Sequence, residues 1–560
     1  MIKKLLRSKR RYRQRGFTLP LVLGMGLIMI VVALTLLSRS QLDVSTASLQ
    51  KQTQQAFAVA EGGMARTLGL LNGNYQILLR RTYNPATNTN FSPSRPYLIS
   101  RSTDATKVGQ PNTTGLDVPP VNEWTAASLG SDAPPCFTLD NLNTIVLSGT
   151  IGDTPDSKGT YRVLAYLYDD QTQTGHLLIE GRLANNSPAN AFILQKVKIT
   201  DRRVPANFPG LLAERINLGN NDVFGTVNGN VICTNPANCV VPPAQCVNGQ
   251  PTQQGLRSAV GALNNSTIEG AIAINKIDLP PFPTWPNPVG GSVLGNLTLT
   301  PLPSWLPAEQ IQDFQRALQA PEGAEEAEGY RGYSEGAYDL GSITDNATFP
   351  RPGDYPYVDP DPNIPFFIPD PLRPGERIVN PEKVYYAYRI NNINLSGNEK
   401  VKFDTSNYAV RLYVSGNISL SGNAGIDNVC SPNSSTCGTD AKIMGLPSGV
   451  GTPDRLRIYG NPPDPNNMKI DQEFTLSGGA QAGSLFVYAP DAKVGINGGS
   501  RDPDIFGAVW AKEWNGSSSN NAEIRVPDRL PEALGGNYAN ASIVVAHTTE
   551  ASNWNRLAQY

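Results

Sequence analysis

Composition and charge restrict what this 560-residue chain can be. It carries 52 glycines, 46 prolines and only 17% charged residues, a composition that favours a turn-rich β protein. Its formal net charge is −2, and subtracting the eight positive charges of residues 1–15 leaves −10. This argues against a nucleic-acid partner, because phosphate binding needs clustered Lys and Arg. The length exceeds what one ordinary core supports and predicts two to four structural units.

The first element in chain order is an apolar segment behind a basic leader. Residues 16–38 carry no charge over 23 residues, whereas residues 1–15 hold eight Lys or Arg and no acid. A helix of ~20 apolar residues spans a bilayer core of ~30 Å, and the basic leader is expected to stay in the cytoplasm. Everything after Arg39 is therefore predicted to be exported. A signal peptide cleaved after the apolar run and an uncut single-pass anchor are the alternatives.

The helical pattern continues beyond the apolar segment. Leu42, Leu49 and Ala56 recur every seven residues, and further apolar residues follow at steps of three or four, which predicts one helical face. These further residues are Phe57, Ala60, Met64, Leu68 and Leu71. Asn72 and Gly73 suit the left-handed conformation that ends helices. The sequence thus predicts one continuous helix over residues 17–72, with a membrane half and an amphipathic half.

Two motifs in this region resemble a known family. Residues 15–20, Arg-Gly-Phe-Thr-Leu-Pro, resemble the prepilin signature of type IV pilins and type II secretion pseudopilins. Residues 56–66 resemble the Ala-Phe-x-x-Ala-Glu-x-x-x-x-Arg stretch of PilX-type minor pilins. The resemblance implies that a prepilin peptidase cuts between Gly16 and Phe17, removes the leader 1–16 and N-methylates the new terminus. It also implies an assembly helix that includes Pro20, Leu21, Phe57, Glu61 and Arg66.

One position departs from the family pattern. Major pilins carry a glutamate as the fifth residue of the processed chain, where this chain has Leu21. A carboxylate inside a bilayer is costly unless it is paired, and in the family it is thought to meet the amino terminus of a neighbouring subunit. Leu21 therefore favours a minor subunit that sits at the fibre tip or primes assembly. The alternative is a position that has drifted in a protein that never polymerises.

Residues 73–200 are predicted to form a head that packs on the helix. Residues 75–135 are polar and proline-rich without a sustained period, which indicates loops and short elements. From Thr160 onward three β-branched and aromatic runs are separated by turn-like polar segments, which predicts an antiparallel meander. Its expected position is against the amphipathic half of the helix, where each large apolar side chain that is buried contributes ~1.5–3 kcal/mol.

Six cysteines fit an exported protein. Two pairs lie close in sequence, with loop-like intervals of six and seven residues: Cys233 with Cys239, and Cys430 with Cys437. We expect these two local disulfides, which leaves Cys136 to pair with Cys246. Zinc needs closer ligand pairs or histidines, and the chain has only His176 and His547, so no metal site is expected.

The second half carries a short repeat of an apolar residue, a small polar residue and glycine. Its copies begin at Leu395, Leu420, Leu476, Ile496 and Trp514, at intervals of 25, 20 and 18 residues within two clusters. Together with a similar texture in residues 201–278, the repeat predicts a parallel, right-handed β-helix-like domain over 201–278 and 384–526. An antiparallel β-sandwich with Gly-Asn hairpins is the rival interpretation. Residues 208–227 and 485–512 resemble the β-helical region of PilX-like pilus assembly proteins.

A proline-rich insertion is predicted at residues 279–383, with a short helix from Pro307 to Ala320, and a tail at residues 527–560. Proline at this density favours extended, exposed backbone. Four acids could offer oxygens to calcium, but without an EF-hand pattern we interpret them as turn residues: Asp354, Asp359, Asp361 and Asp370. The aromatic residues could form a sugar- or protein-binding face or pack the insertion down: Trp285, Trp305, Tyr355, Tyr357, Phe366 and Phe367.

No catalytic constellation and no cofactor site are predicted, because two distant histidines disfavour a Ser-His-Asp arrangement and residues 501–504 suit a solvated turn. We expect an α+β structural minor pilin or pseudopilin, held in the bacterial inner membrane before assembly and displayed at the cell surface afterwards. Its expected partners are the prepilin peptidase, other pilins or pseudopilins and the pilus assembly platform. A surface glycan or protein ligand is left open. The alternative is a membrane-anchored surface protein that binds or cleaves carbohydrate.

Overall fold

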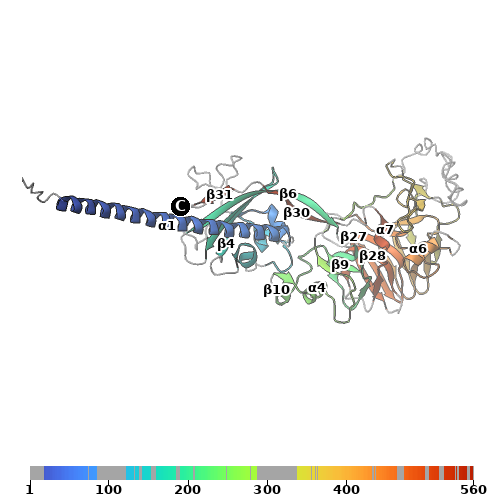
Figure 1. Ribbon diagram of the computed structural model, residues 1–560. Helices are drawn as coiled ribbons and strands as arrows, with labels where there is room; N and C mark the ends of the chain where they lie inside the picture. Colours follow the sequence, from blue (N-terminus) through green and yellow to red (C-terminus); the bar gives the residue numbers. More distant parts are fainter. Residues whose placement is uncertain are drawn as a thin grey trace, which may run out of the picture.

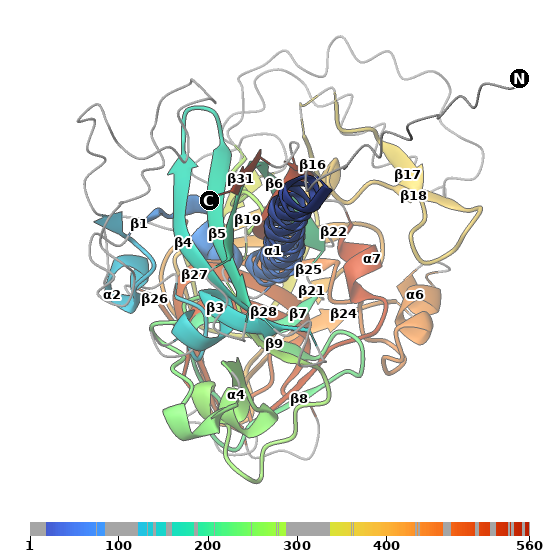
Figure 2. The same ribbon diagram turned by 60° about the vertical axis from the view of Figure 1, so that its left-hand side comes forward.

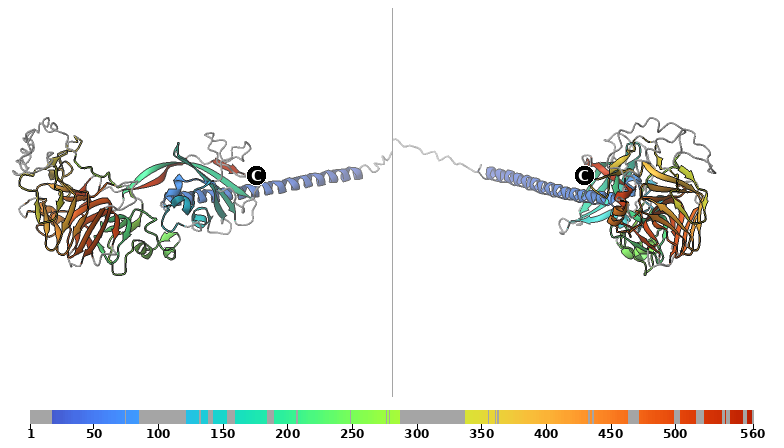
Figure 3. Two further views of the ribbon diagram at one scale, coloured as in Figure 1. Left: turned by 180° about the vertical axis from the view of Figure 1, so that it is seen from behind. Right: turned by 90° about the vertical axis from the view of Figure 1, so that its right-hand side faces the viewer.

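The computed structural model describes residues 18–84, 121–286 and 337–558. Short gaps interrupt these ranges at residues 74, 131–132, 138–141, 153–158, 184–188, 206–207, 248, 276, 278, 355, 360, 362, 432–433, 435–436, 463–471, 499–502, 516–521, 536–537, 539–541 and 552–554. Figures 1 and 3 show a long helix, a head built on its end and a larger β body beyond the head. The expected short helix over residues 307–320 lies outside the described residues.

The long helix α1 spans Thr18–Asn72 and ends where the Asn-Gly stop signal predicts. It is long and apolar enough to cross a membrane, by length and composition. Its first part is exposed, with Leu19 70% and Ile30 61% accessible. From Ala56 onward one face becomes buried. The apolar and the amphipathic halves predicted from the sequence are thus one uninterrupted rod.

An antiparallel sheet covers the amphipathic half of α1. Its central strands are β4 (Gly159–Asp169), β5 (Thr174–Leu183) and β6 (Asn190–Pro205), in the order expected of a meander. Figure 2 shows β4 and β5 beside the helix. The remaining head elements that precede β4 are short. They are η1 (Gln76–Arg80), β1 (Tyr83–Asn84), β2 (Val121–Asn122), α2 (Ala126–Leu129), η3 (Leu142–Val146) and β3 (Ser148–Ile151).

The C-terminal segment returns to the head, which the sequence did not predict. Strands β30 (Ser542–Ala551) and β31 (Asn555–Ala558) both pair antiparallel with β6. Asn72, the last residue of α1, holds this segment through its side chain. Its amide nitrogen donates to the Thr548 hydroxyl at 2.7 Å, and its amide oxygen accepts from the Thr548 backbone N–H at 2.9 Å. The C-terminal segment therefore extends the head sheet and contacts the end of α1.

The body is built from rows of parallel strands. The main row runs in the spatial order β13, β19, β22, β25, β27, β28, β7, β9, β12. In that order the strands are Ala337–Asp339, Val384–Ile390, Ala409–Val414, Leu456–Tyr459, Gly483–Gly498, Ile505–Asn515, Pro209–Asn217, Asn230–Cys233 and Ile272–Ile274. Every neighbouring pair in this row is parallel, whereas the sandwich alternative requires antiparallel hairpins.

Two further rows accompany the main one. One contains β14 (Ser342–Ile343), β20 (Asn392–Leu395), β23 (Ile418–Leu420), β26 (Gln472–Gly478) and the second half of β27; the other contains β15 (Ala347–Phe349), β21 (Lys400–Asp404) and β24 (Gly425–Val429). The repeated glycines mark a corner between rows. Gly397, Gly422 and Gly478 have φ of 64°, 73° and 77°, a conformation that glycine adopts without strain. The copies of the short repeat that begin at Leu395, Leu420 and Leu476 thus form a column of corners.

The chain does not fill the stack in sequence order. Residues 208–275 follow the head in the chain, pair with β28 and form the end of the stack nearest the head. The chain then continues with β13 at the opposite end of the stack. Strands β13, β14 and β15 fall inside the range expected to be a proline-rich insertion, so this range contributes a coil of the stack. Elsewhere the same range holds β16 (Tyr357–Val358) and the hairpin of β17 (Phe367–Pro369) with β18 (Arg377–Val379).

The remaining elements lie around the stack of strands. Near the head lie β8 (Asp222–Phe224), η4 (Pro243–Gln245), β10 (Cys246–Val247), β11 (Gln250–Pro251) and α4 (Gln253–Ala259). Farther along the chain come α6 (Cys437–Ile443), β29 (Glu523–Arg525) and α7 (Leu530–Leu534). Together they leave one large buried apolar cluster in the body, separate from the cluster between α1 and the head sheet.

Candidate functional site

The exposed half of α1 is the first candidate site. Leu21 lies in its first turns and is 53% exposed, and Pro20 lies just before it in the helix. Gly16 and Phe17 fall outside the described residues. Because large apolar side chains are exposed along this half, water is a poor environment for it and a lipid or protein partner is favoured.

The buried half of α1 lies directly on the head sheet because glycines make room for it. A Cβ added at Gly181 would lie 2.4 Å from the Ala56 carbonyl oxygen and 2.5 Å from the Ala60 backbone nitrogen. A Cβ at Gly159 would lie 2.5 Å from the side chain of Val59. The helix backbone therefore approaches strand backbone at a distance that only glycine permits.

Residues 56–66, the stretch that resembles PilX-type minor pilins, lie within this contact. Phe57 is half-buried against the head core, Glu61 is half-buried and Arg66 is exposed. The fully buried neighbour on the sheet is Tyr161, whose ring also faces Gly63. Burial raises the pKa of Tyr161, and the nearby Arg66 charge opposes that rise. The stretch thus packs the helix against the head. Its residues after Ala60 lie in the half of α1 that is seated on the sheet, not in the exposed apolar half.

Three disulfides join the six cysteines. Cys233 pairs with Cys239, Cys430 with Cys437 and Cys136 with Cys246, which fits the pairs expected from sequence. The first two close short loops within the body. The third connects the head to the body across 110 residues.

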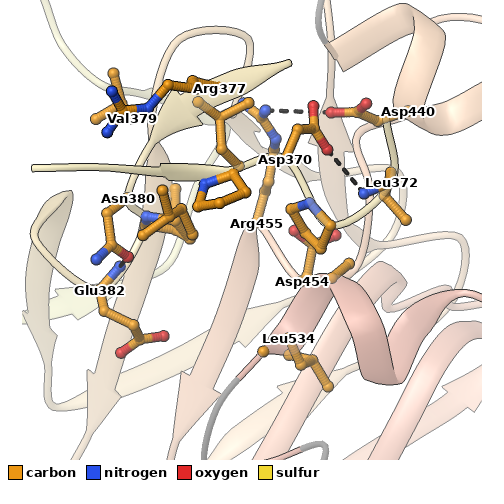
Figure 4. A pocket seen from close by; sticks show the side chains of 18 of the residues that line it. Asp370, Leu372, Arg377, Val379, Asn380, Glu382, Asp440, Asp454, Arg455 and Leu534 are labelled. Carbon is orange, nitrogen blue, oxygen red and sulfur yellow. Dashed lines mark hydrogen bonds and ion pairs between the residues drawn. The ribbon is translucent and has the colours of Figure 1, made fainter. Parts of the chain in front are cut away.

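A cavity of about 1140 Å³ in the body is the second candidate site. It lies between the β17–β18 hairpin, α7 and the start of β25 (Figure 4). Its apolar lining includes Leu372, Val379 and Leu534, and its charged lining includes Asp370, Asp440, Asp454 and Arg455. These residues come from four distant parts of the chain, so no local motif marks the cavity.

Most of the charged side chains on the cavity wall are paired with each other. Arg373 contacts Asp370 at 2.6 Å and Asp440 at 3.4 Å, and Arg455 contacts the other oxygen of Asp440 at 3.3 Å. Burial raises the pKa of Asp440 to about 6, although both arginines oppose this rise. Asp454 is 7% exposed, and its Oδ1 atom has no hydrogen-bond partner within the described residues.

A second charged group lies beneath the same cavity and was not predicted from sequence. Arg411 and Arg457 are 4% and 0% exposed, and both guanidinium groups contact the carboxylate of Glu382. Arg411 also lies 3.7 Å from the centre of the Tyr385 ring. Burial favours the neutral acid, but the two arginines hold the pKa of Glu382 at about 2. This group fixes the chain segment after β18 to the main row of strands.

The acids and aromatic residues considered as ligand-binding candidates in the insertion lie in turns or pack against neighbouring rings. Asp354 accepts from the Tyr388 hydroxyl, and Trp285 packs edge-on against Tyr413 at 5.1 Å. Tyr357 packs on Tyr385, and Phe366 on Phe367. Asp359 and Asp361 accept from nearby backbone N–H groups, as turn residues do. Trp305 and Tyr355 lie outside the described residues.

Metal ligands do not cluster in the part of the chain that the structure describes, where no group of three His, Cys, Asp or Glu side chains is arranged to hold an ion. Of residues 501–504, Arg501 and Asp502 lie outside that part. Asp504 is fully buried rather than solvated, and its Oδ2 accepts from the Glu523 backbone N–H at 2.9 Å. The solvated turn expected for this segment is therefore wrong at Asp504.

Comparison with known proteins adds little to this geometry. No protein-family model and no curated protein matches the chain. Among solved structures, the crystal structure of the competence-associated pilin ComZ from Thermus thermophilus aligns with 91% of this chain and 98% of its own length. The identity is 12% and the TM-score is 0.21.

Proposed function

We propose that this chain is a minor pilin or pseudopilin, cut between Gly16 and Phe17 and assembled through α1 into a type IV pilus or a related secretion pseudopilus. The observation that carries the proposal is α1 itself. One helix combines an exposed apolar half, which directly follows the prepilin-like residues 15–20, with a second half seated on an antiparallel sheet. An apolar helix of this length is unfavourable in water, whereas a bundle of similar helices buries its apolar surface.

In this proposal the helix is inserted in the inner membrane before assembly, with the head and body exported. The apolar half then leaves the lipid and packs with helices of other pilins. Leu21 supports a minor role, because it cannot supply the carboxylate that pairs with a neighbouring amino terminus in the family. The body is displayed on the outside of the fibre, and we infer that its parallel rows form a β-helix.

Processing provides the direct test. The full chain is expressed in a host with and without a prepilin peptidase, extracted from membranes, and its N-terminus is read by mass spectrometry. We expect an N-methylated Phe17 only with the peptidase, and Gly16→Val should block the cut. Gly24→Ala is the matched control, because a Cβ at Gly24 meets nothing within 4 Å. An intact Met1 in both hosts would remove the proposal.

A further inference from the structure

The backbone connects head and body at a single place. The chain leaves the head at Pro205, the end of β6, and enters the body at Pro209. It returns from α7 into the head at Ser542, the start of β30. These two crossings are neighbours, because Pro205 and Ser542 are paired in the sheet. Because these two connections lie side by side, they act as a single hinge. They do not by themselves fix the orientation of the body relative to the head.

A third connection lies elsewhere on the junction. Cys136 of the head is bonded to Cys246, which begins the β10–β11 hairpin of the body. Figure 1 shows β10 on the lower side of the junction and the β6–β30 pair on its upper side. Figure 2, turned about the vertical axis, keeps α4, which follows this hairpin in the chain, at the bottom and β6 near the top. The two attachments are therefore separated in space.

The segment that carries Cys136 is held by both units. Ala133 and Phe137 pack against the head core, and the Phe137 ring lies 6.4 Å from that of Tyr75. Cys136 itself packs against the body core. Its φ is 63°, in the left-handed region that a cysteine rarely adopts. This conformation turns the cysteine toward the body while its neighbour stays in the head.

We propose that the Cys136–Cys246 disulfide is a second fastening that fixes the orientation of the body on the head and carries tension past the head meander. With both attachments in place, rotation about the β6–β30 pair is blocked. Force applied between α1 and the body passes from Cys136 directly to Cys246. Strands β3 to β9, which lie between the two cysteines in the sequence, leave the covalent load path. The inference holds for any force between helix and body and does not depend on the pilin proposal.

The length of chain that the bond removes from the load path makes the proposal measurable. The bond spans 110 residues, which correspond to roughly 370 Å of extended chain at ~3.3–3.6 Å per residue. The full chain, held in detergent, is pulled in an optical trap by handles on non-natural residues at Ala47 and Asn394, both exposed. The wild type is compared with C136S/C246S and with C430S/C437S, whose bond lies outside the pulled segment.

We expect the fully extended wild type and C430S/C437S to be shorter than C136S/C246S by roughly 370 Å. A phosphine reductant added to folded wild type should give a length that exceeds that of C136S/C246S only by the six residues that the Cys233–Cys239 bond closes. This measurement covers the case that the variant folds poorly. A wild type that extends as far as C136S/C246S would overturn the proposal. Orientation is read by fluorescence transfer between labels at the exposed Gln171 and Asn394. The distribution of distances between the two labels should be narrow in the wild type and broader in C136S/C246S. An unchanged distribution would overturn the proposal that the disulfide fixes the orientation.

Discussion

At the scale of single residues, glycines decide how closely the long helix approaches its sheet. Gly181 faces the backbone of α1, with the Ala56 carbonyl oxygen 2.4 Å and the Ala60 nitrogen 2.5 Å from the position of an added Cβ. Backbone atoms of a helix cannot move aside as a flexible side chain can. The short distance between the helix and β5 is therefore set by the absence of a side chain at Gly181.

Gly181→Val should lift α1 from β5 and lower the stability of the head by about 1–3 kcal/mol, the usual cost of overpacking. Denaturant unfolding, followed by fluorescence of the buried Trp124 in the head, measures the effect. Gly69→Ala is the control, since a Cβ at Gly69 meets nothing within 4 Å and alanine favours a helix by up to ~1 kcal/mol. Equal stability of Gly181→Val and wild type would show that the helix is not seated as described.

Asp504 is a residue whose charge works against the fold. It is fully buried, its Oδ1 atom lacks a partner within the described residues, and burial raises its pKa to about 6 although the Glu523 N–H opposes this. An unfolded aspartate titrates near ~3.9. Between pH ~4 and ~6 the folded protein therefore binds more protons than the unfolded chain, and its stability falls as pH rises through this window.

Asp504→Asn removes that titration while its side-chain oxygen can still accept from Glu523. We expect the variant to lose part of the decline in unfolding temperature between pH 4 and pH 6, and to be more stable than wild type above pH 6 by up to ~3 kcal/mol. Differential scanning calorimetry of both proteins across this range is the measurement. Parallel curves for the two proteins would contradict the raised pKa.

At the scale of elements, the segment after β18 is tied to the main row by charge. Glu382 precedes β19 and supplies the carboxylate shared by Arg411 of β22 and Arg457 of β25. Breaking a buried pair costs ~3–5 kcal/mol, because an unpaired charge stays behind in a low-dielectric place. The Glu382 side chain is 41% exposed, so that solvent screens part of this effect.

Glu382→Gln should therefore destabilise the body by about 2–3 kcal/mol, less than a fully buried pair. Glu376→Gln is a matched control. Glu376 contacts Arg373 at 2.6 Å but is 57% exposed, and exposed pairs contribute ~0–1 kcal/mol. Chemical unfolding of both variants gives the comparison. Equal losses in the two variants would mean that the buried arginines are satisfied without Glu382.

Elements with a sustained local period could be predicted from the sequence. The apolar and amphipathic helix and the three long meander strands are of this kind, and α1 ends at Asn72 as the stop signal predicts. The coil β13–β15 could not be predicted from the sequence, because strands of two or three residues, such as Ser342–Ile343, are too short to show a period. Arg411 lies in an otherwise apolar strand and is covered only by residues distant in sequence, such as Glu382.

The candidate sites divide in the same way. The exposed half of α1 could be predicted, since a run without charge is a property of neighbouring residues. The cavity could not, because Asp370, Asp440 and Asp454 come together only when the β17–β18 hairpin, α6 and the start of β25 meet. Disulfide loops of six and seven residues were suggested by spacing, whereas the Cys136–Cys246 pair followed only by elimination.

At the scale of the whole molecule, the head depends on chain segments from both sides of the body. The head sheet is begun by residues near α1 and completed by β30 and β31, with the entire body inserted between β6 and β30. On β6, residues 190–198 pair with β5, whereas Thr200 to Pro205 pair only with β30 among the described strands. The part of β6 nearest the body therefore depends on the last residues of the chain.

Truncation after Tyr538, whose buried ring stays in the body core, should leave this part of β6 without a partner and also remove the Thr548 contacts of Asn72. We expect fast amide exchange at residues 200–205 and unchanged protection in β22, β25 and β27, because these strands pair only within the body. Truncation after Ala551 removes only β31, which pairs with residues 191–194, and should leave residues 200–205 protected. Hydrogen exchange with mass spectrometry distinguishes these outcomes. Loss of protection throughout the body after the longer truncation would show that head and body fold as one cooperative unit.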